Sequence, residues 1–451
     1  MIDLFKLILQ VGVILFTARI VGMIFKKIHQ PQVMGEMVAG ILLGPTLFGW
    51  LAPAMSKALF PAPSLGYLNA LSQVGLVLFM FLVGLSLNPK ELHSHGHAAV
   101  LTSHVSIITP FCLGSLMALF LYPRMSDDSV SFMGFALFMG AAMSITAFPV
   151  LARILTERNL LRSRMGTLAI ACAAVDDVTG WCILAYIILL IRTTHAGRPI
   201  WLTLGGLLVY VFLMLFGVKR LLAWFEKSFR RSGRLTENAL AFMVISALAS
   251  ALATEFLGIH LLFGAFLMGA IMPKSADFIR YVLHRFESVT VLVLLPLFFA
   301  YSGLRTNIGI GHNGMWWAFA SIVIVVAIAG KLGGSMIAAR FAGIGWRDAA
   351  SLGILMNTRG LMELVILNIG LDIGVISPAV FSMMVLMALV TTFMTTPLLE
   401  WAYPARLMRT EVRARRSAGS VTGSCCVGAS RSRLGTSTHL RIEQNCSIIG
   451  R

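Results

Sequence analysis

The chain has 451 residues, of which 58% are hydrophobic and only 12% are charged. This composition excludes a soluble globular domain and is typical of a polytopic membrane protein. On a soluble protein the formal net charge of +17 would suggest a nucleic-acid partner. In a membrane protein such an excess lies in loops on one side of the bilayer, so no nucleic acid is expected.

Apolar runs long enough to cross a bilayer alternate with charged or helix-breaking segments along the chain. They predict thirteen transmembrane helices, near residues 3–24, 32–50, 66–87, 98–121, 130–152, 165–192, 200–218, 237–255, 258–273, 287–304, 315–339, 348–371 and 377–400. The break near 255–258 is weak, which leaves twelve as the alternative count. We predict one transmembrane domain over residues 1–402.

Lys and Arg residues are concentrated in every second loop, which the positive-inside rule assigns to the cytoplasm. Examples are Lys26, Lys27, Arg153, Arg162, Arg230, Arg231, Lys274 and Arg340. The N-terminus is therefore predicted outside and the C-terminus inside. Residues 403–451 are rich in Arg, Ser and Gly, and we predict that they form a disordered, basic cytoplasmic tail.

With thirteen spans, two sets of six helices lie in opposite orientations on either side of one linker helix. Such inverted repeats are a common transporter plan, and here the fifth and twelfth spans carry matching irregularities. The polar or helix-breaking residues in the two spans are Ser144, Thr146, Pro149, Asn357, Thr358, Arg359, Gly360 and Glu363. Pro and Gly free backbone groups that can face a polar cavity, so we predict two discontinuous helices, with ordinary kinks as the alternative.

The sixth span places two adjacent carboxylates, Asp176 and Asp177, near the middle of the membrane. Each costs about 2.5–3.5 kcal/mol to insert even on a lenient scale, so such residues usually handle charge. Hydrogen bonding to a neighbouring helix is the structural alternative. Adjacent residues point about 100° apart on a helix, so the two carboxylates should have different partners.

Lys331 lies in the centre of the eleventh span, where an unpaired ammonium would be unfavourable. We expect one of the two aspartates to pair with it, and snorkelling to the interface is the alternative. The other aspartate would then face the break in the fifth span, where Ser144, Thr146 and freed carbonyls offer oxygen ligands to a monovalent cation. A carboxylate that holds either a proton or a cation is sufficient for obligatory exchange.

Two further clusters carry charge. Arg359 and Glu363 are four residues apart on one helix face, and we expect them to neutralise each other and to hold the broken helix. His93, His95 and His97 form an HxHxH run after the third span. This run could bind a metal, sense cytoplasmic pH, or serve only as a polar loop.

Several strings resemble the bacterial monovalent cation:proton antiporters of the second subgroup, which have the sodium/proton exchanger-like fold. They are VMGEMVAGILLGPTLFG, FLVGLSLNP, SITAFPVLARIL, AAVDDVTGW, GIHLLFGAFLMGAIMP, PLFFAYSGLRTNI and MNTRGLMELVILNIG. The likeness extends from about residue 4 to residue 399.

That resemblance implies a homodimer in a bacterial inner membrane, with crossed discontinuous helices 5 and 12 and an elevator-like movement. Asp177 looks like the carboxylate that carries the cation and the proton, and Asp176 looks like the partner of Lys331. Thr146 lies in the crossing break. The Asp-Asp pair is closer to the sodium/proton members than to the potassium-efflux members, although the twelfth span also resembles plant-type potassium exchangers.

The sequence therefore predicts a secondary antiporter that exchanges Na+ or K+ for H+ by alternating access at Asp176 and Asp177. No enzymatic activity, cofactor or resident metal is expected, and the partners are the two transported ions and membrane lipid. A gated cation channel without proton coupling is the alternative. An intramembrane aspartyl protease is a poorer one, because two adjacent residues on one helix cannot face each other as a catalytic dyad.

Overall fold

The computed structural model describes residues 4–87, 96–126, 130–158, 160, 163–196, 200–232, 235–308 and 314–402. Within this part of the chain all regular elements are helices, as predicted. Eleven are long and apolar enough to cross a membrane, and a pair bent by 42° makes a twelfth span. The predicted ninth span is a shorter apolar helix, α14 (Leu261–Ile271). The tail 403–451, His93, His95 and the side chain of His97 lie outside the described residues.

One group of helices packs through closely approaching backbones. It comprises α1 (Leu4–Lys27), α2 (Gln32–Leu43), α5 (Ala62–Ser86), α14 and α16 (Leu295–Leu304). A side chain at Gly40 would collide with the backbone of α16, and one at Gly303 would collide with the backbone of α2. The GxxxG pattern of Gly40 and Gly44 therefore joins two helices of the same chain.

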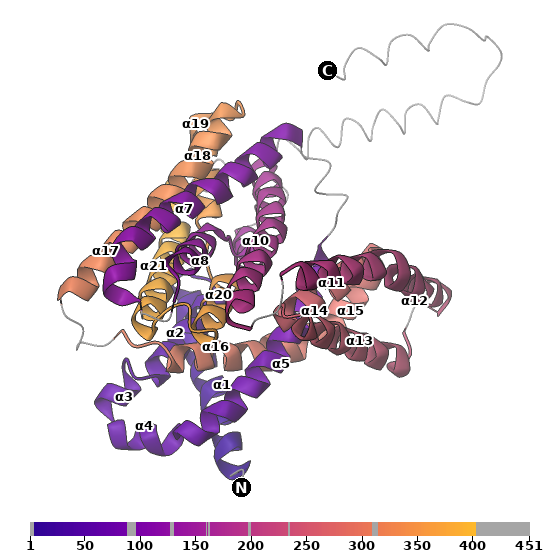
Figure 1. Cartoon of the computed structure of the whole chain (residues 1–451), viewed down its shortest axis with the longest axis horizontal. Coiled ribbons are helices and arrows are strands. Elements are labelled where there is room, and N and C mark those ends of the chain that lie inside the picture. The colour runs from indigo at the N-terminus through magenta and orange to yellow at the C-terminus, as the bar shows by residue number, and fades with distance from the viewer. Residues whose placement is uncertain are drawn as a thin grey trace, which may run out of the picture. The chain divides into compact units, whose positions relative to one another are not determined.

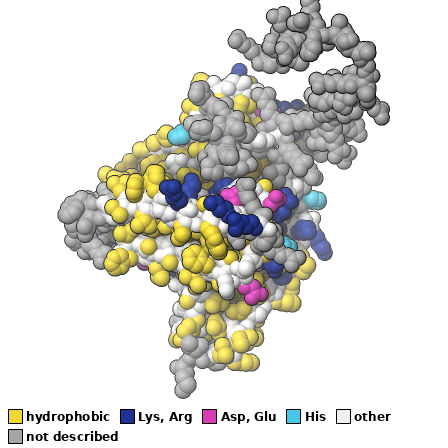
Figure 2. Space-filling view, turned by 90° about the vertical axis from the view of Figure 1, so that its right-hand side faces the viewer, with side chains coloured by type: hydrophobic (Ala, Val, Ile, Leu, Met, Phe, Trp, Pro, Cys, Tyr) yellow, Lys and Arg dark blue, Asp and Glu magenta, His cyan; other side chains and the backbone are white. Residues whose placement is uncertain are grey.

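A further set of helices connects or flanks the members of this group. They comprise α3 (Phe48–Leu51), α4 (Pro53–Leu59), α11 (Ile200–Phe212), the π-helix η1 (Leu213–Val218), α12 (Lys219–Ser232), α13 (Glu237–Phe256), α15 (Ala276–Val289) and the π-helix η2 (Thr290–Leu294). Leu208, Phe212 and Phe216 are each more than 60% exposed, which suits contact with lipid. Figure 2 shows hydrophobic side chains over much of one face, with Lys and Arg gathered in a patch.

A second group of helices surrounds the charged residues that the sequence analysis identifies. It comprises α7 (Gly96–Met125), α8 (Phe132–Ser144), α9 (Phe148–Glu157), α10 (Arg164–Ala196), α17 (Gly314–Ile328), the π-helix η3 (Ala329–Gly333), α18 (Gly334–Phe341), α19 (Trp346–Met356), α20 (Leu361–Asp372) and α21 (Pro378–Ala402). Helix α7 packs along α8, α10, α17 and α18 (Figure 1).

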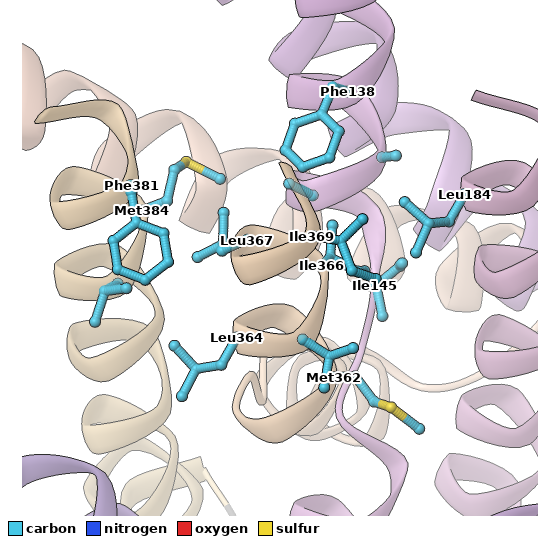
Figure 3. Packing of buried hydrophobic residues seen from close by; sticks show 14 of the residues in the cluster. Phe138, Ile145, Leu184, Met362, Leu364, Ile366, Leu367, Ile369, Phe381 and Met384 are labelled. Carbon is cyan, nitrogen blue, oxygen red and sulfur yellow. The ribbon is translucent and has the colours of Figure 1, made fainter. Parts of the chain in front are cut away.

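Helix α20 forms the apolar centre of the second group. Its residues from Leu361 to Gly370 are all buried. Figure 3 shows Leu364 and Leu367 turned toward Phe381 of α21, with Ile369 on the side of α8 and α10. Because α20 is mostly apolar and enclosed by protein, the polar residues at its start lie in the dry interior rather than against lipid.

Candidate functional site

The fifth predicted span is interrupted. Helix α8 ends at Ser144, an extended segment follows, and α9 begins at Phe148. Pro149 stands in the first turn of α9, where the missing N–H of proline removes no helical hydrogen bond. The predicted discontinuity in this span is therefore present, and proline begins the second half-helix rather than bending a continuous one.

The twelfth predicted span is interrupted in the same way, and the two breaks meet. Helix α19 ends at Met356 and α20 begins after Gly360. The backbone amide of Ala147 donates to the Thr358 carbonyl at 3.0 Å, and the Thr146 hydroxyl donates to the Met356 carbonyl at 3.2 Å. Each break thus satisfies backbone groups that the other one exposes.

Asp176 lies beside this crossing and is fully buried. Its carboxylate accepts hydrogen bonds from the hydroxyls of Ser103 at 2.6 Å, Ser106 at 3.2 Å and Thr146 at 2.9 Å. The single hydroxyl proton of Thr146 is shared between Asp176 and the Met356 carbonyl. Lys331 completes the set at 2.7 Å. Four donors therefore converge on this one buried carboxylate and satisfy its oxygens.

Lys331 lies in the π-helical turn η3 and has no solvent-exposed surface. Its ammonium donates to Asp176, to the Ser106 carbonyl at 3.0 Å and to the Ser144 carbonyl at 2.5 Å. These bonds use all three of its donors, so the side chain does not snorkel to the interface. Single π turns within helices often occur at functional sites, where they redirect one side chain.

Asp177 is as deeply buried as Asp176, at 1% exposed. However, neither of its carboxylate oxygens accepts a hydrogen bond from the residues that the structure describes. The backbone amide of Phe148, at the start of α9, lies close to this carboxylate, but it donates to the Thr146 carbonyl at 3.1 Å. The two aspartates therefore have different surroundings, as helix geometry predicts, and Asp177 is the one whose oxygens have no hydrogen-bond partner among the described residues.

The structure corrects two details of the predicted site. The Thr146 hydroxyl donates to Asp176, the aspartate that also pairs with Lys331, and not to Asp177. The Ser144 hydroxyl donates back to the Ala141 carbonyl within α8 at 2.8 Å, because a serine at a helix end readily bonds the preceding turn. The Ser144 carbonyl, rather than its side chain, reaches the charged cluster.

The polar residues at the second break are also buried. Thr358 donates its hydroxyl to the Leu355 carbonyl at 2.7 Å, and the Asn357 side-chain oxygen has no hydrogen-bond partner among the described residues. Arg359 and Glu363 approach to 3.4 Å, as their spacing predicts. In addition, the Arg359 guanidinium reaches across to α8, a contact that the sequence does not reveal.

Ser103 and Ser106 are site residues that the sequence analysis missed. They are spaced i and i+3 on α7 and so lie on one helix face. Both are fully buried. The stretch LTSHVS, polar within an otherwise apolar span, is the only trace of them in the sequence.

A model of the family described as "Sodium/hydrogen exchanger, transmembrane" matches residues 12–401. The chain belongs to the sodium/hydrogen exchanger family. The resemblance drawn from the motifs is thereby confirmed, and the match covers the described helices from α1 to α21.

Characterised relatives of this exchanger are found in several groups of organisms. The chain is 44% identical over 405 residues to the Na(+)/H(+) antiporter NhaS4 of Synechocystis, covering 89% of this chain and 98% of that one. It is 38% identical to cation/H(+) antiporter 17 of Arabidopsis thaliana and 33% identical to K(+)/H(+) antiporter 1 of Saccharomyces cerevisiae, covering 88% of this chain in each case. The exchanger spans only about half of these two longer relatives, 48% and 46%.

The fold is also that of a solved antiporter. The sodium proton antiporter MjNhaP1 from Methanocaldococcus jannaschii superimposes with a TM-score of 0.66 over 90% of this chain and 98% of that one. The two sequences are only 14% identical, so this likeness concerns the fold alone.

Proposed function

We propose that this exchanger family member transports Na+ or K+ in exchange for H+, with Asp177 as the carboxylate that binds both in turn. The observation that carries the proposal is the unpaired, buried carboxylate of Asp177 beside the saturated pair of Asp176 and Lys331. A proton and a monovalent cation cannot neutralise the same carboxylate together. If the site opens alternately to the two sides, exchange is obligatory.

The charges around the helix crossing support a monovalent substrate. Asp176, Asp177 and Glu363 contribute three negative charges when ionised, and Lys331 and Arg359 contribute two positive ones; all five are buried. One cation or one proton would balance the remaining charge. Uncompensated charge in a dry interior is strongly unfavourable, so the empty site favours taking up one of the two.

The names of the relatives agree with this chemistry, since they include both a Na(+)/H(+) and a K(+)/H(+) antiporter. We further propose that the exchanger is a homodimer in a bacterial inner membrane, with its N-terminus outside and without enzymatic activity. An aspartyl protease needs two carboxylates that share a proton. Asp176 is instead held by Lys331 and three hydroxyls, which argues against that chemistry.

The test uses purified protein in liposomes with an imposed pH gradient and a pH-sensitive dye inside. Na+, K+ and Li+ are added in separate assays, and an ion that the protein transports should dissipate the pH gradient. Asp177→Asn should lower this rate by roughly a hundredfold or more, as expected when an essential proton-binding group is lost. Asp277→Asn, an exposed change at the start of α15, is the matched control and should transport like the wild type.

Two results would overturn the proposal. Undiminished exchange by Asp177→Asn would remove Asp177 from the mechanism. Cation flux that proceeds without any movement of protons would instead identify a channel.

A further inference from the structure

Arg359 is the largest fully buried side chain of the described residues, and most of its contacts are not with its ion-pair partner. Its guanidinium donates to the Ala142 carbonyl at 3.1 Å and to the Met143 carbonyl at 2.6 Å. Glu363 lies 3.4 Å away, and its oxygens accept no hydrogen bond from the described residues. The two well-formed bonds of the guanidinium thus go to a different helix.

Those two carbonyls lie at the end of half-helix α8. The last carbonyls of a helix have no intrahelical partner and carry the negative end of the helix dipole. The next carbonyl in the chain, that of Ser144, accepts from Lys331. Two buried cations therefore bind three consecutive carbonyls at one helix end, and Lys331 extends from there to Asp176.

The backbone of Arg359 is itself fixed. Its amide donates to the Thr392 hydroxyl at 2.9 Å, and that hydroxyl oxygen lies 2.8 Å from the Arg359 carbonyl, to which it donates. Helix α21 thereby holds the backbone of the break, and the guanidinium of Arg359 holds the end of α8. This arrangement fixes the end of α8 relative to the break between α19 and α20.

We propose that Arg359 is a positioning residue for the ion site: by forking across the Ala142 and Met143 carbonyls it fixes the end of α8, and so the place of Lys331 beside Asp176. The inference rests on the proposed antiport. It differs from simple neutralisation of Glu363, because the contact that matters is the fork on α8. Lysine would keep the charge of Arg359 and lose the fork.

Three variants separate these two roles when cation-dependent exchange is measured in liposomes as a function of cation concentration and pH. Arg359→Lys should raise the cation KM about tenfold, since a charge-assisted hydrogen bond is lost, and leave the pH profile in place. Arg359→Gln removes the fork and also one positive charge from the buried cluster, so the more negative site should favour protons over the cation. Its half-maximal exchange should shift to higher pH by about one unit.

The third variant, Arg359→Gln combined with Glu363→Gln, leaves the net charge of the site unchanged. If Arg359 served only to neutralise Glu363, this double variant would recover the wild-type KM and pH profile, and that result would overturn the proposal. We expect the KM to remain about tenfold raised. A wild-type KM for Arg359→Lys would overturn the proposal as well.

Two controls keep the outcome interpretable. Arg158→Gln removes the ion-pair partner of the exposed Glu400 and should leave the KM unchanged. A variant that merely folds poorly lowers the maximal rate and the yield without moving the KM or the pH profile. The proposed function is tested separately, by showing that the wild type exchanges ions and that Asp177→Asn does not. Failure of the Arg359 role can therefore be distinguished from failure of antiport.

Discussion

Replacing Lys331 by Met should destabilise the protein strongly, and the size of the effect follows from the contacts of the ion pair. Removing one member of a buried pair costs about 3–5 kcal/mol, because the other charge is left uncompensated. Asp176 would keep three hydroxyl donors, each worth about 1 kcal/mol. We therefore expect the free energy of unfolding to fall by about 3 kcal/mol, near the lower limit of that range.

The reverse change, Asp176→Asn, leaves the Lys331 ammonium with two carbonyl acceptors and should cost about the same. The double variant contains no uncompensated charge from this pair. Its free energy of unfolding should fall by about 3 kcal/mol, rather than by about 6 kcal/mol, the sum of the two single effects. The difference is a coupling energy of about 3 kcal/mol between the two residues.

Unfolding of the purified variants in mixed detergent micelles measures these differences. Lys57→Met, a change at an exposed lysine in α4, should stay within about 0.5 kcal/mol of the wild type. Additive losses in the double variant, with a coupling energy below about 0.5 kcal/mol, would refute the view that Lys331 and Asp176 stabilise each other.

Further predictions concern groups outside the site. Burial, with a nearby lysine, lowers the pKa of Lys274 from 10.5 to about 7, so between these pH values the unfolded chain binds more protons and stability should rise with pH. Lys274→Met should abolish that rise when the Tm in detergent is compared at pH 7 and pH 10. Gly303→Val should cost about 2 kcal/mol by forcing α16 away from Gly40, seen as a lower Tm and aggregation on heating. Asp372→Asn, which breaks a partly exposed 2.7 Å pair with Arg305, should cost less than about 1 kcal/mol by the same Tm measurement.

Hydropathy and helix breakers were sufficient to predict most of the fold. Spans could be located because apolar runs must match the bilayer thickness. The two interruptions could be located because Pro149 and Gly360 stand in otherwise apolar helices. Helix α14 shows the limit of this reasoning, since its 11 residues fall short of a full span.

The inner contacts of the site could not be predicted in the same way. Hydroxyls are frequent in membrane helices, so the polar stretch LTSHVS was not enough to identify Ser103 and Ser106 as site residues. Which aspartate Lys331 meets depends on the rotation of α10 against the π turn η3, and rotation about a helix axis is a property of packing. The intramembrane carboxylates themselves were predictable, because their insertion into lipid is so unfavourable.

The hydrogen bond between Ala147 and Thr358 sets a mechanical condition on how the site can change sides. If either unwound segment swung away alone, a peptide N–H and a peptide C=O would lose each other in a medium without water, at several kcal/mol for each group. Local opening at the crossing is therefore the unfavourable route. The less demanding route is to move both breaks and the ion together as one rigid body, because this hydrogen bond then stays intact throughout.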